Sequence, residues 1–129
     1  MTRSDIYMLL ALLVFFIMAF APRCHAQEFS DIQIVNAIYL SEGGDHATYP
    51  YGIRSIKCES KSACRNICLT TVRHNRKRFE EYGYREYPQF VQFLGERYCP
   101  TKGRNLSSSE KRLNKNWVKN VEYFLGRGI

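Results

Sequence analysis

The longest continuous run of apolar residues lies near the start of the chain. Residues 6–22 (IYMLLALLVFFIMAFAP) hold no charged side chain, yet the run falls short of the ~20 residues that a membrane-spanning helix needs. Small side chains at Cys24 and Ala26 match the cleavage site of an export signal. The pattern therefore predicts a signal peptide over residues 1–26, with an uncleaved membrane anchor as the alternative.

Beyond residue 27 the apolar side chains recur every three or four residues, which is the spacing of amphipathic helices. The first stripe starts after Ser30, a favourable N-cap, and stops at the glycine pair 43–44. A second stripe follows Ser60 or Ser62 and reaches Phe79. Each of these two stripes predicts a helix with one buried face.

Two further helices are predicted in the second half of the chain. The third runs from residue 86 or 87 to Tyr98, and the fourth covers residues 114–125. Residues 101–113 between them are polar and rich in serine, which predicts a surface loop whose last four residues belong either to the loop or to the next helix. Only residues 53–56 are open to a short turn or strand. The predicted fold class is therefore mainly α.

The length and the net charge of the chain limit the range of possible functions. A chain of 129 residues has room for one ordinary domain beside a signal, here residues 27–129, and we expect a monomer. Its 19 Lys and Arg outweigh its 12 Asp and Glu, which gives a formal net charge of +7. Such a protein is expected to meet an anionic partner. Export favours a cell-wall polymer or an anionic lipid over a nucleic acid, and no nucleic-acid partner is expected.

The cysteines point to an oxidising compartment. Cys58, Cys64, Cys68 and Cys99 remain after the predicted cleavage, and an even set in a small exported domain predicts two disulfides. A bridge between Cys64 and Cys68, four residues apart on one helix, would strain the backbone. We therefore expect the pairs 58–64 and 68–99. A zinc site is the alternative, but the spacing lacks the paired short knuckles of structural zinc sites, and no metal is expected.

One carboxyl group has a setting suited to proton transfer. Glu42 ends the first predicted helix, directly before the glycine pair 43–44. The negative end of the helix dipole and the apolar neighbours Ile38 and Tyr39 both oppose its ionisation. A carboxylic acid that keeps its proton near neutral pH can donate it to a glycosidic oxygen. The alternative is a solvated carboxylate at a helix end.

Two short motifs carry a resemblance to a known family. Residues 38–44 (IYLSEGG) and 51–56 (YGIRSI) resemble the Glu-Ser-Gly-Gly and Gly-Leu-Met-Gln-Ile motifs of the lysozyme-like lytic transglycosylases. The resemblance implies a small lysozyme-like helical domain that cleaves peptidoglycan, with Glu42 as the single general acid and base. It implies that neither a cofactor nor a metal is needed.

The resemblance also implies a set of substrate contacts. The segment after residue 50 is expected to line the sugar cleft, and Ser55 takes the place of the family's Gln. Asn75 is either substrate-facing or structural. The expected substrate-binding residues are Tyr51, Gly52, Ile53, Ser55 and Asn75. The protein is expected in the periplasm or outside the cell, or anchored to the membrane if the signal is retained, with membrane contact only through the signal segment.

Two other functions remain open. The first is a wall-binding module of the same fold without catalysis. The second is a basic, disulfide-stapled envelope protein that binds through residues 73–78 (RHNRKR). Such a charge run either grips polyanions or forms a solvated helix face.

Overall fold

The computed structural model describes residues 28–55, 57–102 and 105–128, together with Asp5, Tyr7, Met8, Leu10, Leu12, Leu13 and Phe16. The predicted cleavage site after Ala26 and most of the predicted signal peptide lie outside the described residues, as does Ile56. Within the described part of the chain, no helix is both long enough and apolar enough to cross a membrane.

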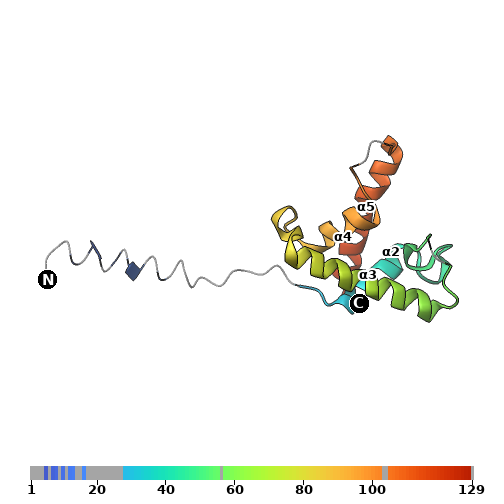
Figure 1. Ribbon diagram of the computed structural model, residues 1–129, viewed down its shortest axis with the longest axis horizontal. Helices are drawn as coiled ribbons and strands as arrows, with labels where there is room; N and C mark the ends of the chain where they lie inside the picture. The colour runs from blue at the N-terminus through green and yellow to red at the C-terminus, as the bar shows by residue number, and fades with distance from the viewer. Residues whose placement is uncertain are drawn as a thin grey trace.

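Helices dominate the described fold, and none of its residues lies in a strand (Figure 1). The mainly α fold class is thus confirmed. Residues 53–55, the described part of the segment that was open to a turn or strand, form no strand. The elements are α2 (Asp31–Ser41), η1 (Gly44–His46), η2 (Pro50–Gly52), α3 (Lys61–Glu81), η3 (Gly83–Arg85), α4 (Phe90–Tyr98) and α5 (Ser108–Leu125).

The first two helices begin where their capping residues predict. Ser30 caps α2 in a reciprocal capping box with Gln33, so two backbone N–H groups at the helix start are satisfied. Ser60 rather than Ser62 caps α3 and accepts a hydrogen bond from the Ala63 N–H. In both cases a serine hydroxyl supplies the acceptor that the helix end lacks.

The last two helices begin elsewhere than expected. α4 starts at Phe90, because the preceding chain turns through η3 and the extended residue Gln89 before it becomes helical. α5 starts at Ser108, six residues before the predicted Asn114. Ser107 and Glu110 form a capping box there, and this cap extends a polar helix that hydrophobic periodicity could not reveal.

The core is built around α2. Four of its side chains are at most 1% exposed, and the helix packs against both α3 and α5. In Figure 1 the N-terminal part of α5 projects away from the other helices, and its first buried residue is Trp117. Apolar burial of this kind is the main stabilising contribution to a small domain. The buried residues are Ile34, Val35, Ala37, Ile38, Tyr51, Cys64, Cys68, Val72, Phe90, Val91, Phe93, Leu94, Trp117, Val121 and Leu125.

Gly95 lets α4 approach α5 closely. A Cβ atom at this position would overlap the side chain of Val118 and lie 3.3 Å from Cε3 of Trp117. Because glycine has no side chain, the indole of Trp117 packs directly over the backbone of α4. This contact sets the position of Trp117 relative to the rest of the fold.

One of the two expected disulfides is formed. Cys58 and Cys64 are bonded, with their Cα atoms 5.3 Å apart. The expected pairing of Cys68 with Cys99 is wrong, because both are free thiols. Cys68 is fully buried and its Sγ lies 3.4 Å from the hydroxyl of Tyr98, so the residue before Cys99 occupies the space that faces Cys68. Tyr98 on the last turn of α4, and not the C-cap residue Cys99, therefore contacts Cys68.

Candidate functional site

Glu42 stands at the C-cap of α2, which directs it toward α5. Its backbone N–H still donates to the carbonyl of Ile38, while the next residue, Gly43, donates to the carbonyl of Leu40, has a φ of 107° and turns the chain away. Only glycine adopts this conformation without strain. The Glu42 side chain is half-buried, so its carboxyl group has both protein contacts and access to solvent.

A tryptophan from the far end of the sequence holds this carboxyl group. Trp117 Nε1 donates a hydrogen bond of 2.8 Å to Oε1 of Glu42. The indole is 7% exposed and stacks on the ring of Tyr98, with centroids 5.1 Å apart and planes inclined by 19°. An indole N–H can only donate, so Oε1 must act as an acceptor. A proton on the carboxyl group therefore belongs on Oε2, to which no described residue donates a hydrogen bond.

Gly52 lies directly against the same carboxyl group. Its φ is 69°, and a Cβ atom would lie 2.7 Å from Oε1 and 3.2 Å from Oε2 of Glu42. Glycine is therefore required for both the backbone conformation and the close approach. The two motifs of the sequence, which are separated by residues 45–50, meet at this contact.

Tyr51, one of the expected substrate-binding residues, is buried against α2. It is 4% exposed, its ring lies 5.1 Å from that of Tyr39, and its φ is 59°, which is unusual for a residue with a side chain. Burial raises the pKa of its hydroxyl above the ordinary value. Tyr51 thus anchors η2 to α2 and leaves Gly52 against Glu42.

Three weak acids surround the carboxyl group of Glu42. Burial raises the pKa of Cys68 to about 11, and the charge of Glu42 contributes to the shift. Burial and the same charge raise the pKa of Cys99 to about 11. The pKa of Tyr98 is raised as well, by burial first and then by Cys68. These groups therefore stay protonated and neutral at physiological pH.

Asp45 is the acidic residue closest to Glu42 in the sequence, and it is engaged elsewhere. Its carboxylate pairs with Lys61 and accepts a hydrogen bond of 2.5 Å from the Tyr39 hydroxyl. The hydrogen bond from Lys61 is the main cause that lowers the pKa of Asp45. A carboxylate held in this way is a stable anion at neutral pH and a poor proton donor.

The other expected substrate-binding residues are not all brought together. Ile53 is half-buried and Ser55 is exposed, both in the segment after Gly52. Asn75 lies on α3 and is 4% exposed; its Nδ2 donates to the carbonyl of Thr71 and its Oδ1 has no partner in the described part of the chain. The burial of Asn75 favours a structural role over a substrate-facing one.

A groove opens beside the Gly52 segment. It has a volume of about 500 Å³ and lies between the end of α2, residues 44–54 and the start of α3. Glu42, Tyr51 and Gly52 do not line it, although their neighbours do. The lining residues are Tyr39, Gly44, Asp45, Ala47, Thr48, Tyr49, Pro50, Ile53, Arg54, Lys57, Cys58, Ser60, Lys61 and Cys64.

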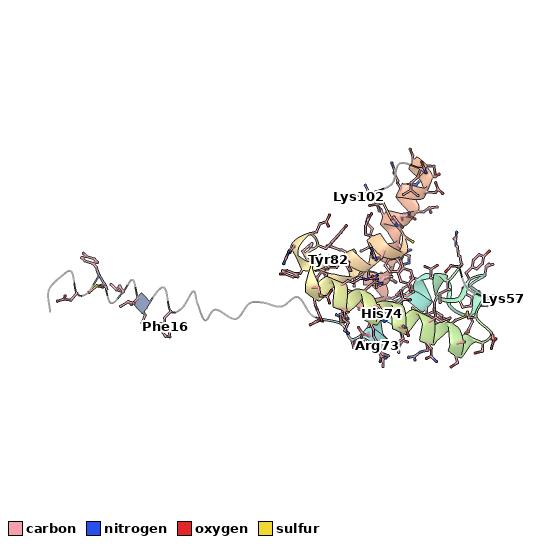
Figure 2. All side chains as sticks on the ribbon, viewed as in Figure 1. Phe16, Lys57, Arg73, His74, Tyr82 and Lys102 are labelled. Atoms are coloured by element: carbon pink, nitrogen blue, oxygen red, sulfur yellow. A yellow bond between two sulfur atoms is a disulfide. The ribbon has the colours of Figure 1, made fainter. Side chains whose placement is uncertain are left out.

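The basic run of residues 73–78 is divided between two roles. Arg76 points inward, 15% exposed, and bonds Asp31, Glu28 and the Phe29 carbonyl at the start of α2. Arg73 and Lys77 are exposed on α3. Figure 2 shows Arg73 and His74 midway along α3, between Lys57 at one end of the helical body and Tyr82 at the other.

Sequence reasoning missed Trp117 and Tyr98 as parts of the site. The helical spacing of Trp117 with Val121 indicates a core residue, which is true of its ring, but this spacing does not reveal the direction of the N–H. One sequence signal was available: Trp117 is the single tryptophan, and a buried indole N–H needs a hydrogen-bond acceptor.

Comparisons with protein-family models, curated proteins and solved structures found no match for this chain. In the described part of the chain, no cluster of three or more His, Cys, Asp or Glu side chains is arranged to hold a metal ion. The resemblance to lytic transglycosylases therefore stays a prediction, and the case for a function rests on the geometry around Glu42.

Proposed function

We propose that this protein is an exported, lysozyme-like enzyme that cleaves peptidoglycan as a lytic transglycosylase, with Glu42 as the general acid and base. The observation that carries the proposal is the half-buried Glu42 carboxyl group, with Oε1 bound by Trp117 and Oε2 without a donor among the described residues. A general acid needs this combination of fixed orientation and one available oxygen.

The proposed reaction uses one carboxyl group twice. Oε2 of Glu42 donates its proton to the glycosidic oxygen as the bond from that oxygen to C1 of the sugar breaks. The resulting carboxylate then removes the proton of the sugar's own 6-hydroxyl, whose oxygen bonds to C1 and gives an anhydro product. The proton balance closes, and Asp45, held by Lys61 and Tyr39, is not needed as a second carboxylate.

The test is the digestion of purified cell-wall sacculi by the full chain, with the soluble products identified by mass spectrometry. We expect anhydro muropeptides from the natural sequence. We expect Glu42→Gln to lower their release by about 1,000-fold or more, because removal of a general acid that also serves as base costs at least the 10²–10⁴ of one such step. Circular dichroism should remain unchanged.

Glu81→Gln is the matched control, because Glu81 is an exposed carboxylate at the end of α3. It should release muropeptides at the natural rate. Equal activity of Glu42→Gln and Glu81→Gln would remove Glu42 from the mechanism. Reducing-end products in place of anhydro products would indicate hydrolysis by a lysozyme.

A wall-binding module without catalysis is the second candidate. The groove of about 500 Å³ favours it, because Glu42 does not line that groove. This function predicts that the protein sediments with sacculi, releases no soluble product and binds equally well as Glu42→Gln. Product release that depends on Glu42 would exclude it.

A further inference from the structure

The groove beside Gly52 combines two aromatic rings with an excess of positive charge. Tyr49 is 49% exposed, and Tyr39 is half-buried on the wall formed by α2. The Arg54 guanidinium lies 5.5 Å from the Tyr49 ring centre, and Lys61 Nζ lies 5.1 Å from that of Tyr39. Exposed tyrosine rings are suited to stack on sugar rings, because they offer an apolar face with a polar tip.

The charges of the groove are not balanced. Asp45 is its one acidic residue and is already paired with Lys61. Arg54 and Lys57 are exposed and form no ion pair with any described residue. Two cations with free donors that line one groove favour a ligand that carries negative charge.

The disulfide gives the groove a fixed wall. Cys58 and Cys64 both line it, and their bond ties the segment that carries Lys57 to the first turns of α3. Tyr51, packed on Tyr39, fixes the segment from the other side. Arg54 therefore lies three residues from the anchored Tyr51 and Lys57 one residue from the disulfide, which limits the ordering cost of binding.

The groove is also close to the proposed catalytic residue. Gly52 contacts the carboxyl group of Glu42, and Arg54 follows only two residues later, at most about 7 Å along the chain. A glycan strand that passes Glu42 would reach the groove within one or two sugar rings.

From these observations we infer that Arg54 and Lys57 bind the carboxylate substituents of a glycan strand while Tyr49 stacks on one of its sugar rings. This makes the groove the element that selects a carboxylated glycan over a neutral one of the same length. The inference rests on the proposed function for the identity of the glycan, and it concerns binding only.

The test measures affinity by calorimetry with the full chain carrying Glu42→Gln, so that no probe is cleaved. The probes are chitotetraose, which is neutral, and a tetrasaccharide of alternating N-acetylglucosamine and N-acetylmuramic acid, which bears free carboxylates. We expect the dissociation constant of the carboxylated probe to be about tenfold lower, since two exposed charge contacts contribute of the order of a factor of ten.

Two double variants with the same change in charge locate the effect. Arg54→Gln with Lys57→Gln should bring the affinity of the carboxylated probe to that of chitotetraose. Arg73→Gln with Lys77→Gln, on the exposed face of α3, should keep the tenfold preference. Equal preference in the groove variant and the parent, or an equal loss in both double variants, would overturn the inference.

The outcome is separable from that of the proposed function. A tenfold preference that depends on Arg54 and Lys57, in a protein that releases no muropeptide from sacculi, would refute the enzyme and leave the groove inference standing. Glu42-dependent cleavage without the tenfold preference would refute the groove inference and leave the enzyme proposal standing.

Discussion

The two ends of α2 each hold a charged side chain, and they use it in opposite ways. At the N-terminal end, Arg76 bonds Asp31 at 2.5 Å, Glu28 at 2.9 Å and the Phe29 carbonyl at 2.8 Å, and its guanidinium lies 4.3 Å from the centre of the Phe90 ring. At the C-terminal end, Glu42 accepts from one neutral donor in the described part of the chain, Trp117. Arg76 has all three guanidinium nitrogens engaged, whereas one oxygen of Glu42 has no donor among these residues.

The difference shows how to distinguish a structural charge from an available one. A charged group whose donors or acceptors are all satisfied within the protein contributes to stability, because its removal leaves its partners unpaired. A charged group with one oriented contact and one free atom can act on a ligand. The comparison predicts that changes at the Arg76 end affect stability, and that changes at the Glu42 end affect activity.

The largest expected effect on stability is that of Arg76→Ala. It leaves the Phe29 carbonyl without its partner and the carboxylate of Asp31 with only the longer contact of 4.0 Å to Arg73, and we expect the free energy of unfolding to fall by about 3 kcal/mol. Urea denaturation measures this change. Arg78→Ala, an exposed neighbour on α3, should stay within about 0.5 kcal/mol of the natural sequence. Equal effects at both positions would show that the three contacts of Arg76 add nothing to stability.

Gly52→Ala should disturb the other end of α2. The new Cβ meets the flexible carboxyl group of Glu42, so we expect that group to move and muropeptide release to fall about 100-fold. The positive φ adds a stability cost of about 1–2 kcal/mol. Gly126→Ala is the control, because its φ is −66° and its nearest contact would be an ordinary 3.5 Å. Unchanged release in Gly52→Ala would contradict the role of this contact.

Glu96 is a third charged group to which the same distinction applies, with a smaller expected effect on stability. Glu96 accepts hydrogen bonds from the N–H and hydroxyl of Thr101 and from the Lys102 N–H, so its oxygens, like the nitrogens of Arg76, are in use. Burial alone would raise the pKa of Glu96, but these hydrogen bonds outweigh it and hold the pKa below the usual 4.5. We expect Glu96→Gln to cost about 1 kcal/mol at neutral pH without loss of activity.

The pH dependence of that cost follows from the direction of the shift. Because the folded-state pKa of Glu96 is lowered, its contribution is complete above the unfolded value near 4.5 and is lost as the pH falls through the folded value. The difference in unfolding free energy between the natural sequence and Glu96→Gln should therefore shrink in acid. A difference that is constant from pH 7 to pH 3 would argue against these bonds to the carboxylate.

Much of the fold follows from local patterns, and the site follows from them only in part. The serine caps at residues 30 and 60 and the glycine pair 43–44 mark helix ends through backbone hydrogen bonding, which depends on neighbouring residues alone. The pairing of Trp117 with Glu42 joins residues 75 positions apart and depends on how α5 packs against α2. No local pattern encodes that packing.

The remaining differences have similar causes. The second disulfide was expected from the number of cysteines. Pairing depends, however, on which side chains the tertiary fold brings together, and Tyr98 contacts Cys68 where Cys99 was expected. Residues 73–78 read as one basic surface, yet Arg76 turns inward while Arg73 and Lys77 remain outside. A sequence shows which side chains are charged, whereas their partners are set by the tertiary fold.

The most direct test of this account is the indole N–H signal of Trp117 in a ¹H–¹⁵N correlation spectrum, where a single tryptophan gives a single peak. We predict a downfield peak that is slow to exchange with solvent, that shifts upfield and exchanges faster in Glu42→Ala, and that stays in place in Asp45→Ala. An indole peak that is identical in all three proteins would show that Trp117 does not hold Glu42.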